Sequence, residues 1–181
     1  QRLPARLDRM VAWAPRTTPQ VMSLDLARIR ELPGGASLVR RLADDDASAV
    51  ELYERTRYAI YGIGVSADDP ATEAAAAILD PSDPPAPLVD ELAAAPADAD
   101  GSRRMRTQTF SLVLTPERFL LVVPRALAGD ADVVPERRTM AEGPALETLR
   151  AILASESGSP IASFVITPAP NARPLSYVLR E

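Results

Sequence analysis

Arginines are the residues of this chain with the clearest capacity for binding chemistry. A guanidinium group binds a phosphate or a carboxylate through paired hydrogen bonds, so several converging arginines can form an anion site. The sequence offers an anion-binding set if folding brings its members together: Arg103, Arg106, Arg118, Arg137 and Arg138. The alternative is that these arginines form surface ion pairs, because the chain contains 25 acidic residues and 20 basic ones.

Three residue types that carry much of enzyme chemistry are missing. The chain contains no histidine and no cysteine, and all 20 of its basic residues are arginine. Without histidine there is no imidazole base and no usual nitrogen ligand for zinc, and without cysteine there is no thiolate nucleophile. Without lysine there is no Schiff base. A serine–histidine–aspartate triad is therefore excluded, and no metal or cofactor is expected.

Carboxylates are the remaining candidates for catalysis. A hydrolase that uses only carboxylates needs two of them facing each other in a pocket, one with a raised pKa. The acidic residues concentrate in predicted turns and helix caps, and almost none interrupts a predicted strand. A carboxylate-only hydrolase is therefore kept as an alternative and not as the leading interpretation.

Charge and hydropathy restrict the partners. The net charge is −5 and the isoelectric point is about 4.9. Nucleic acids and anionic membranes attract positively charged surfaces, so neither is an expected partner. No apolar run reaches the roughly 20 residues that a membrane-spanning helix needs.

Alternating and continuous apolar runs predict a set of strands. The clearest signal is a β-hairpin, in which two apolar runs flank the turn Thr115-Pro116-Glu117-Arg118, with proline at the second position of a type I turn. The predicted strands are Gln20–Leu24, Arg57–Val65, Phe110–Leu114, Phe119–Val123 and Ile161–Thr167. The last stretch, Leu175–Arg180, is either a strand or the start of a helix.

Helices are predicted between these strands. Asp25 can cap a turn over Leu26–Leu32, Ser37 can cap the next helix, and the run Asp44-Asp45-Asp46 can cap a third. Further helices are predicted over Ala71–Leu79, over Leu88–Ala95 and after Gly143. This order predicts an α+β fold, with a mostly antiparallel sheet and helices packed on at least one face. The residues expected in its core are Phe110, Leu112, Leu121, Ile63, Phe164, Leu149 and Ile152.

Residues 66–102 differ in composition from the rest of the chain. They are rich in proline, alanine and aspartate, and include the stiff run Asp80-Pro-Ser-Asp-Pro-Pro-Ala-Pro87. We expect a single α+β domain over residues 1–181, with 66–102 as an exposed and weakly hydrogen-bonded surface insertion or linker.

The N-terminal third carries one resemblance to known proteins. The stretch that starts Pro19-Gln-Val-Met-Ser-Leu-Asp-Leu-Ala and continues to Leu42 resembles the opening of large exported proteins of myxobacteria and their relatives. The resemblance covers about residues 19–66 and implies an exported domain of uncharacterised role. It carries over no catalytic residues.

The predicted function follows from these exclusions. The leading interpretation is a non-catalytic interaction or structural module of an exported or assembled bacterial protein. An antiparallel sheet leaves an edge that natural proteins cover, and the predicted edge is Gln20–Leu24 or Leu175–Leu179. A protein partner or self-association through these terminal segments is therefore expected. The alternatives are an anion-binding domain built on the arginines and the carboxylate-only hydrolase.

Overall fold

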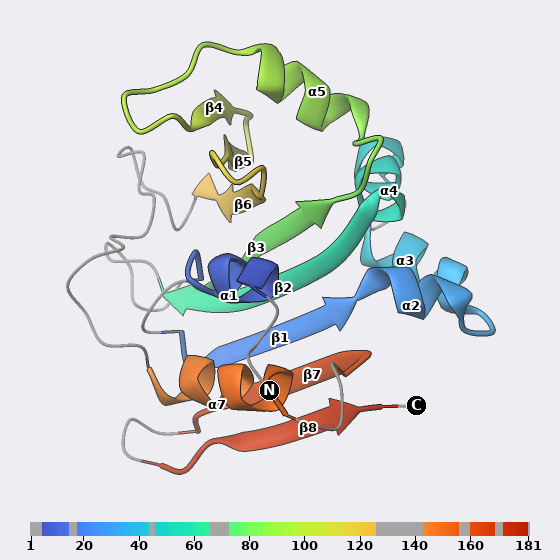
Figure 1. The fold of residues 1–181 in the computed structure, drawn as a ribbon, viewed down its shortest axis with the longest axis vertical. Helices are drawn as coiled ribbons and strands as arrows, with labels where there is room; N and C mark the ends of the chain where they lie inside the picture. The colour runs from blue at the N-terminus through green and yellow to red at the C-terminus, as the bar shows by residue number, and fades with distance from the viewer. Residues whose placement is uncertain are drawn as a thin grey trace.

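A computed structural model describes residues 5–14, 18–43, 46–65, 73–125, 143–155, 160–168 and 172–180. It is an α+β structure, as predicted, in which an eight-stranded antiparallel sheet carries six helices (Figure 1). The strands are β1 Gln20–Asp25, β2 Thr56–Val65, β3 Glu73–Pro81, β4 Arg103–Arg106, β5 Phe110–Leu114, β6 Leu120–Pro124, β7 Ala162–Ile166 and β8 Leu175–Leu179. The helices are α1 Ala5–Val11, α2 Leu26–Glu31, α3 Gly35–Leu42, α4 Ala47–Glu54, α5 Pro87–Ala94 and α7 Pro144–Leu153.

The strand order is β4-β5-β6-β3-β2-β1-β7-β8, so β4 and β8 form the two edges. The predicted hairpin is confirmed, because β5 and β6 pair antiparallel in the register Phe110↔Pro124 to Leu114↔Leu120. The segment Leu175–Leu179 is a strand, and it lies at an edge as predicted. The other predicted edge is wrong, because β1 pairs with both β2 and β7.

Hydrophobic side chains cover both faces of the sheet. Successive side chains of a strand point to opposite faces, so neighbours such as Ile78 and Leu79 belong to different clusters. On one face, α1 and α7 pack over residues that include Ile60 and Phe119. On the other face, α2 to α5 pack over residues that include Leu120. In Figure 1, α1 and α7 lie in front of the sheet, and α2 to α4 gather at its right-hand end.

Helix starts follow the predicted capping in two cases. The Asp25 carboxylate accepts a hydrogen bond from the Arg28 N–H at 3.0 Å, and Asp46 accepts one from Ala49 at 2.9 Å. These bonds satisfy N–H groups that have no partner inside the helix. The predicted cap at Ser37 is wrong, because α3 already begins at Gly35.

The interpretation of residues 66–102 as an exposed insertion is wrong for most of its length. The described part of the segment predicted as a helix over Ala71–Leu79 belongs to β3, which pairs with β2 and β6 in the interior of the sheet. Its alanines favour a helix intrinsically, but pairing on both sides outweighs that preference. Helix α5 also buries Val89 and Leu92. The backbone N–H of Ser82 donates a hydrogen bond to the Arg55 carbonyl at 2.6 Å, so this segment is not weakly hydrogen-bonded throughout. Residues 66–72 lie outside the described part.

The core prediction is partly confirmed. Leu112, Leu121 and Leu149 are buried. The prediction is wrong for Phe110. This first residue of β5 lies outside both core clusters and is 39% exposed. The remaining members of the predicted core are half-buried: Ile63, Phe164 and Ile152.

Candidate functional site

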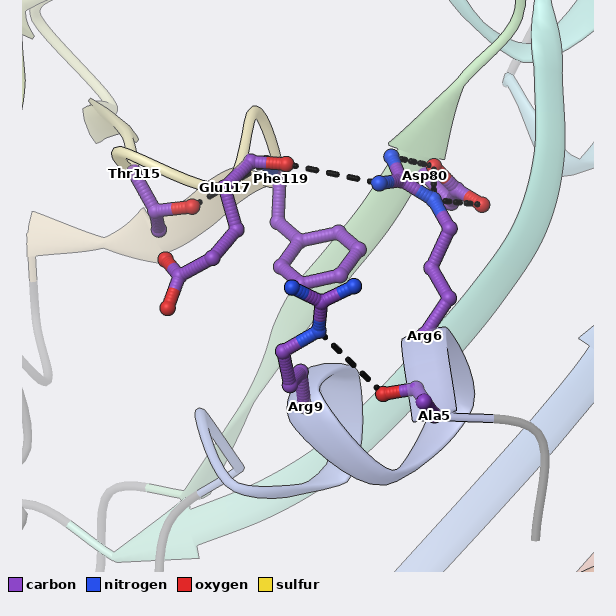
Figure 2. Close-up of polar contacts among 7 residues, drawn as sticks. All are labelled: Ala5, Arg6, Arg9, Asp80, Thr115, Glu117 and Phe119. Carbon is purple, nitrogen blue, oxygen red and sulfur yellow. Dashed lines mark hydrogen bonds and ion pairs between the residues drawn. The ribbon is translucent and has the colours of Figure 1, made fainter.

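An ion pair joins the N-terminal helix to the middle of the sheet. Arg6 on α1 places its Nε atom 3.0 Å from each carboxylate oxygen of Asp80, near the end of β3 (Figure 2). A second nitrogen of the same guanidinium also donates to Asp80. The hydrogen bonds that Arg6 donates to Asp80 raise the pKa of Arg6, desolvation of its guanidinium opposes that rise, and the negative charge of Asp80 adds to it. The pair is therefore a fixed, charged element next to solvent.

Two further contacts hold the Arg6 guanidinium in place. Its carbon lies 4.7 Å from the centroid of the fully buried Phe119 ring, within the range of a cation–π interaction. Its Nη1 atom lies 3.5 Å from the Glu117 carbonyl oxygen. Both residues belong to the β5–β6 connection, so α1, β3 and the hairpin meet at this arginine (Figure 2).

The arginines predicted as an anion site lie in different places. Arg103 donates its Nε to the Ala95 carbonyl at 2.9 Å, just beyond α5. Arg106 lies opposite Ser111 in the register of β4 and β5, near the start of β5. Arg118 lies in the turn beyond the other end of β5. Arg137 and Arg138 lie outside the described residues.

Neighbouring Arg104 forms surface ion pairs, the alternative that the sequence left open. It pairs with Asp98 at 2.9 Å and with Asp100 at 3.3 Å. The pKa of Asp100 is lowered, first by the Ser102 hydroxyl and then by the Ser102 N–H, both of which hydrogen-bond its carboxylate. This acidic turn is therefore held by its own neighbours.

Asp80 is the one carboxylate among the buried residues of the described part of the chain. Both of its oxygens accept hydrogen bonds from Arg6. A carboxylate bound in this way is an ion-pair partner and not a free base. The geometry at Asp80 thus adds no support to a hydrolase that would work through this residue.

Three tyrosines have raised pKa values. Burial raises the pKa of Tyr58 to about 12, and the nearby negative charge of Asp25 adds to the rise. Burial also raises the pKa of Tyr53 and of Tyr61. The hydrogen bond between their hydroxyl groups lowers the pKa of Tyr53 and raises that of Tyr61. These hydroxyls belong to the packing of the sheet, and they stay neutral at physiological pH.

The second notable surface is the β8 edge, which we define as Leu175, Tyr177 and Leu179 together with the half-buried Met22 and Phe164 beside them. All five residues of β8 are exposed, with Tyr177 at 68%. The registers place these apolar side chains on one face of the sheet, in rows across β1, β7 and β8. A groove of about 340 Å³ is lined by Met22, Phe164, Tyr177 and Leu179 of this edge, together with Ala162, Ser163 and Val178.

The main-chain groups of β8 divide into a bonded and an open side. Thr167 donates to the Pro19 carbonyl and Ile161 accepts from Asp25, so odd-numbered residues of this segment bond to β1. Even-numbered residues of β7 therefore face β8, where their register partners are Leu175, Tyr177 and Leu179. The remaining N–H and C=O groups of β8, those of Ser176 and Val178, point outward from the sheet.

Comparisons with protein-family models, with curated proteins and with solved structures find no match for this chain. The resemblance of residues 19–66 to exported myxobacterial proteins stays a prediction. No helix in the described ranges is long and apolar enough to cross a membrane. Within the same ranges no group of three metal-ligating side chains occurs.

Sequence reasoning found the β8 edge but missed the Arg6–Asp80 pair. The edge was detectable because the apolar alternation of Leu175, Tyr177 and Leu179 is local. Nothing local identified α1 as a helix that packs on the sheet, and Asp80 was assigned to a connector. The signal that could have located β3 is its run of apolar residues, which is typical of an interior strand.

Proposed function

We propose that this protein is a non-catalytic interaction module that associates with a second copy of itself through the open edge of β8. The observation that carries the proposal is a fully exposed edge strand, Leu-Ser-Tyr-Val-Leu, without a charged residue. An exposed edge strand presents unpaired N–H and C=O groups and is a template for pairing with another strand. Apolar edges of this kind are favoured docking surfaces.

The two edges of the sheet differ in a way that supports this assignment. Strand β4 reads Arg-Arg-Met-Arg, so the edge that it forms carries charges. Charged side chains are a common device against unwanted edge pairing. Strand β8 has no such protection within its five residues, and its apolar row continues onto Met22 and Phe164. A covering partner at β8 would remove these side chains from water.

The edge is complementary to itself in one antiparallel register. If Tyr177 lies on the two-fold axis, Ser176 of one copy faces Val178 of the other, and both outward groups of each residue are bonded. In the same register Leu175 faces Leu179 of the second copy. The three apolar side chains on this face of the strand, Leu175, Tyr177 and Leu179, then pack against apolar side chains. Each Tyr177 would meet its own counterpart across the axis.

This self-facing position permits a charge-swap experiment. We expect the unmodified chain to show a concentration-dependent dimer in sedimentation equilibrium. Tyr177→Arg and Tyr177→Glu should each be monomeric, because like charges directly opposite each other destabilise a strand pair. Mixing the two variants should restore a dimer with one copy of each. Both substitutions are at an exposed side chain, so the fold should tolerate them.

A matched control uses another exposed apolar residue. Leu38 on α3 is 52% exposed, the same fraction as Leu175, and lies outside the β8 edge. Leu38→Arg should leave the association unchanged. The proposal fails if the unmodified chain stays monomeric at all concentrations, or if the mixed variants do not associate. It also fails if Leu38→Arg abolishes the dimer as fully as Tyr177→Arg does.

A further inference from the structure

A polar cavity of about 500 Å³ lies beside the Arg6–Asp80 pair. Its polar lining consists of Arg6, Arg57, Asp80, Ser82, Asp83 and Arg118, and prolines complete it. Arg6 is paired with Asp80, whereas the guanidinium groups of Arg57 and Arg118 have no hydrogen-bond or ion-pair partner among the described residues. A chain with an excess of acidic residues thus leaves two guanidinium groups unpaired at one cavity.

A backbone irregularity places Arg57 at this cavity. The register between β2 and β3 shifts there, since Thr56 pairs with Pro81 and Tyr58 pairs with Asp80. Arg57 is the extra residue of the resulting β-bulge. Bulges occur often beside binding and active sites, where they redirect a side chain. Here the redirected side chain is an exposed arginine on the cavity wall.

A second irregularity places Arg118 at the same cavity. Arg118 has φ = 65° and is the one non-glycine residue with positive φ in the described part of the chain. Its N–H donates to the Thr115 carbonyl at 2.8 Å, and the Thr115 N–H donates to the Phe119 carbonyl at 2.9 Å. These two hydrogen bonds define a tight hairpin turn with a bulge. Glycine is the ordinary residue at this position, because a Cβ there is sterically unfavourable. Backbone strain of this kind is concentrated at functional sites.

The Arg6–Asp80 pair supplies a rigid part of the cavity wall. Asp80 neutralises Arg6, so the formal charge of the cavity comes from Arg57, Arg118 and the exposed Asp83. Two cations and one carboxylate leave the cavity net positive. Because Phe119 and Asp80 both hold Arg6, this wall is ordered before any ligand arrives. Preordered groups lose little freedom on binding.

We propose that this cavity binds a phosphate monoester of a small hydroxyl-bearing molecule, with Arg57 and Arg118 on the phosphate. A guanidinium takes two oxygens of an anion at once. Two guanidinium groups, one from β2 and one from the β5–β6 turn, suit the several terminal oxygens of a phosphate better than the two oxygens of one carboxylate. The cavity volume exceeds what a phosphate alone occupies and lies in the range of small-molecule sites. Ser82 and Asp83 are then available to the hydroxyl groups of the ligand.

The test is isothermal titration calorimetry at constant ionic strength, with inorganic phosphate, glycerol 3-phosphate and acetate as separate probes. Saturable binding of both phosphate probes is expected, with glycerol 3-phosphate the tighter one, and no saturation by acetate. Arg57→Gln and Arg118→Gly should each weaken phosphate binding on the order of tenfold or more, because each removes charge-assisted hydrogen bonds. Glycine at position 118 suits the positive φ, so the loss would not reflect misfolding.

Two further variants separate a built site from general attraction. Arg41→Gln removes one charge from α3, away from the cavity, and should leave binding unchanged. Asp83→Asn removes the one free carboxylate of the cavity, so it should tighten inorganic phosphate and reduce the preference for glycerol 3-phosphate. Equal weakening by Arg41→Gln and Arg118→Gly would overturn the proposal, as would the absence of saturation by either phosphate probe. Stronger binding of acetate than of phosphate would also overturn it. These outcomes do not depend on association through β8.

Discussion

Arg6 and Asp80 are 74 positions apart in the chain, and the Arg6 Nε atom lies 3.0 Å from both Asp80 oxygens. The two partners differ in their contact with water. The Arg6 side chain is 41% exposed, whereas that of Asp80 is 7% exposed. This difference makes the pair asymmetric, because an arginine that loses its partner can turn to solvent and a buried carboxylate cannot.

The asymmetry predicts the order of two substitutions. Arg6→Met leaves a buried carboxylate without a cation and should reduce the free energy of unfolding by about 2–3 kcal/mol. Asp80→Asn leaves a hydratable arginine and should cost about 1–2 kcal/mol, since solvent screens the remaining charge. Urea unfolding at neutral pH measures both. As a control, Arg9→Met on the same helix should stay within about 0.5 kcal/mol of the unmodified chain. The reverse order for Arg6 and Asp80 would contradict the argument.

Local patterns predicted the hairpin and the capped helices, because their signals lie within a few residues. The turn Thr115-Pro116-Glu117-Arg118 and the cap at Asp25 need no information from elsewhere in the chain. The prediction for the β3 segment was wrong because the signal that decides its structure is not local. An alanine-rich run suits a helix by propensity, and only its pairing with β2 and β6 makes it a strand.

The cavity could not be predicted from the sequence for a related reason. Arg118 was part of the predicted anion set, but its companions at the cavity are Arg6 and Arg57. Their meeting depends on the placement of α1 and on a bulge in β2, and neither leaves a local pattern. The β8 edge was predictable because the apolar alternation of Leu175, Tyr177 and Leu179 is a local pattern.

Relief of strain at Arg118 should stabilise the fold. Arg118→Gly removes the Cβ from a residue with φ = 65°, where side chains are disfavoured. We expect the free energy of unfolding to rise by up to about 1 kcal/mol, because the strain released exceeds the added freedom of the unfolded chain. The matched variant Glu117→Gly, at a neighbouring turn position without positive φ, should lower stability instead. Equilibrium unfolding of the two variants in urea decides the sign.

The adjacent glycines at the start of α3, Gly34 and Gly35, should respond differently to alanine. A Cβ on Gly35 would lie 1.7 Å from the Ile29 carbonyl oxygen, so the end of α2 would have to move. Gly34 has φ = 76° but open space around its Cα. We expect Gly35→Ala to cost at least about 2 kcal/mol as an overpacked site, and Gly34→Ala about 1 kcal/mol as backbone strain alone. Thermal unfolding of both variants tests the order, and equal losses would contradict it.

Alkaline pH should destabilise the protein through its buried tyrosines. Burial raises the pKa of Tyr58 to about 12, whereas a tyrosine in the unfolded chain titrates near pH 10. The unfolded state therefore loses this proton first, so the stabilisation is complete below pH 10 and is lost as the pH rises to about 12. The contribution lost by pH 11 is about 1.4 kcal/mol. Tyr53 and Tyr61 shift in the same direction, and no lysine or cysteine titrates in this range. Urea unfolding at pH 8 and pH 11 should show this decline, and Tyr58→Phe should reduce it; an unchanged decline in Tyr58→Phe would assign the effect to other groups.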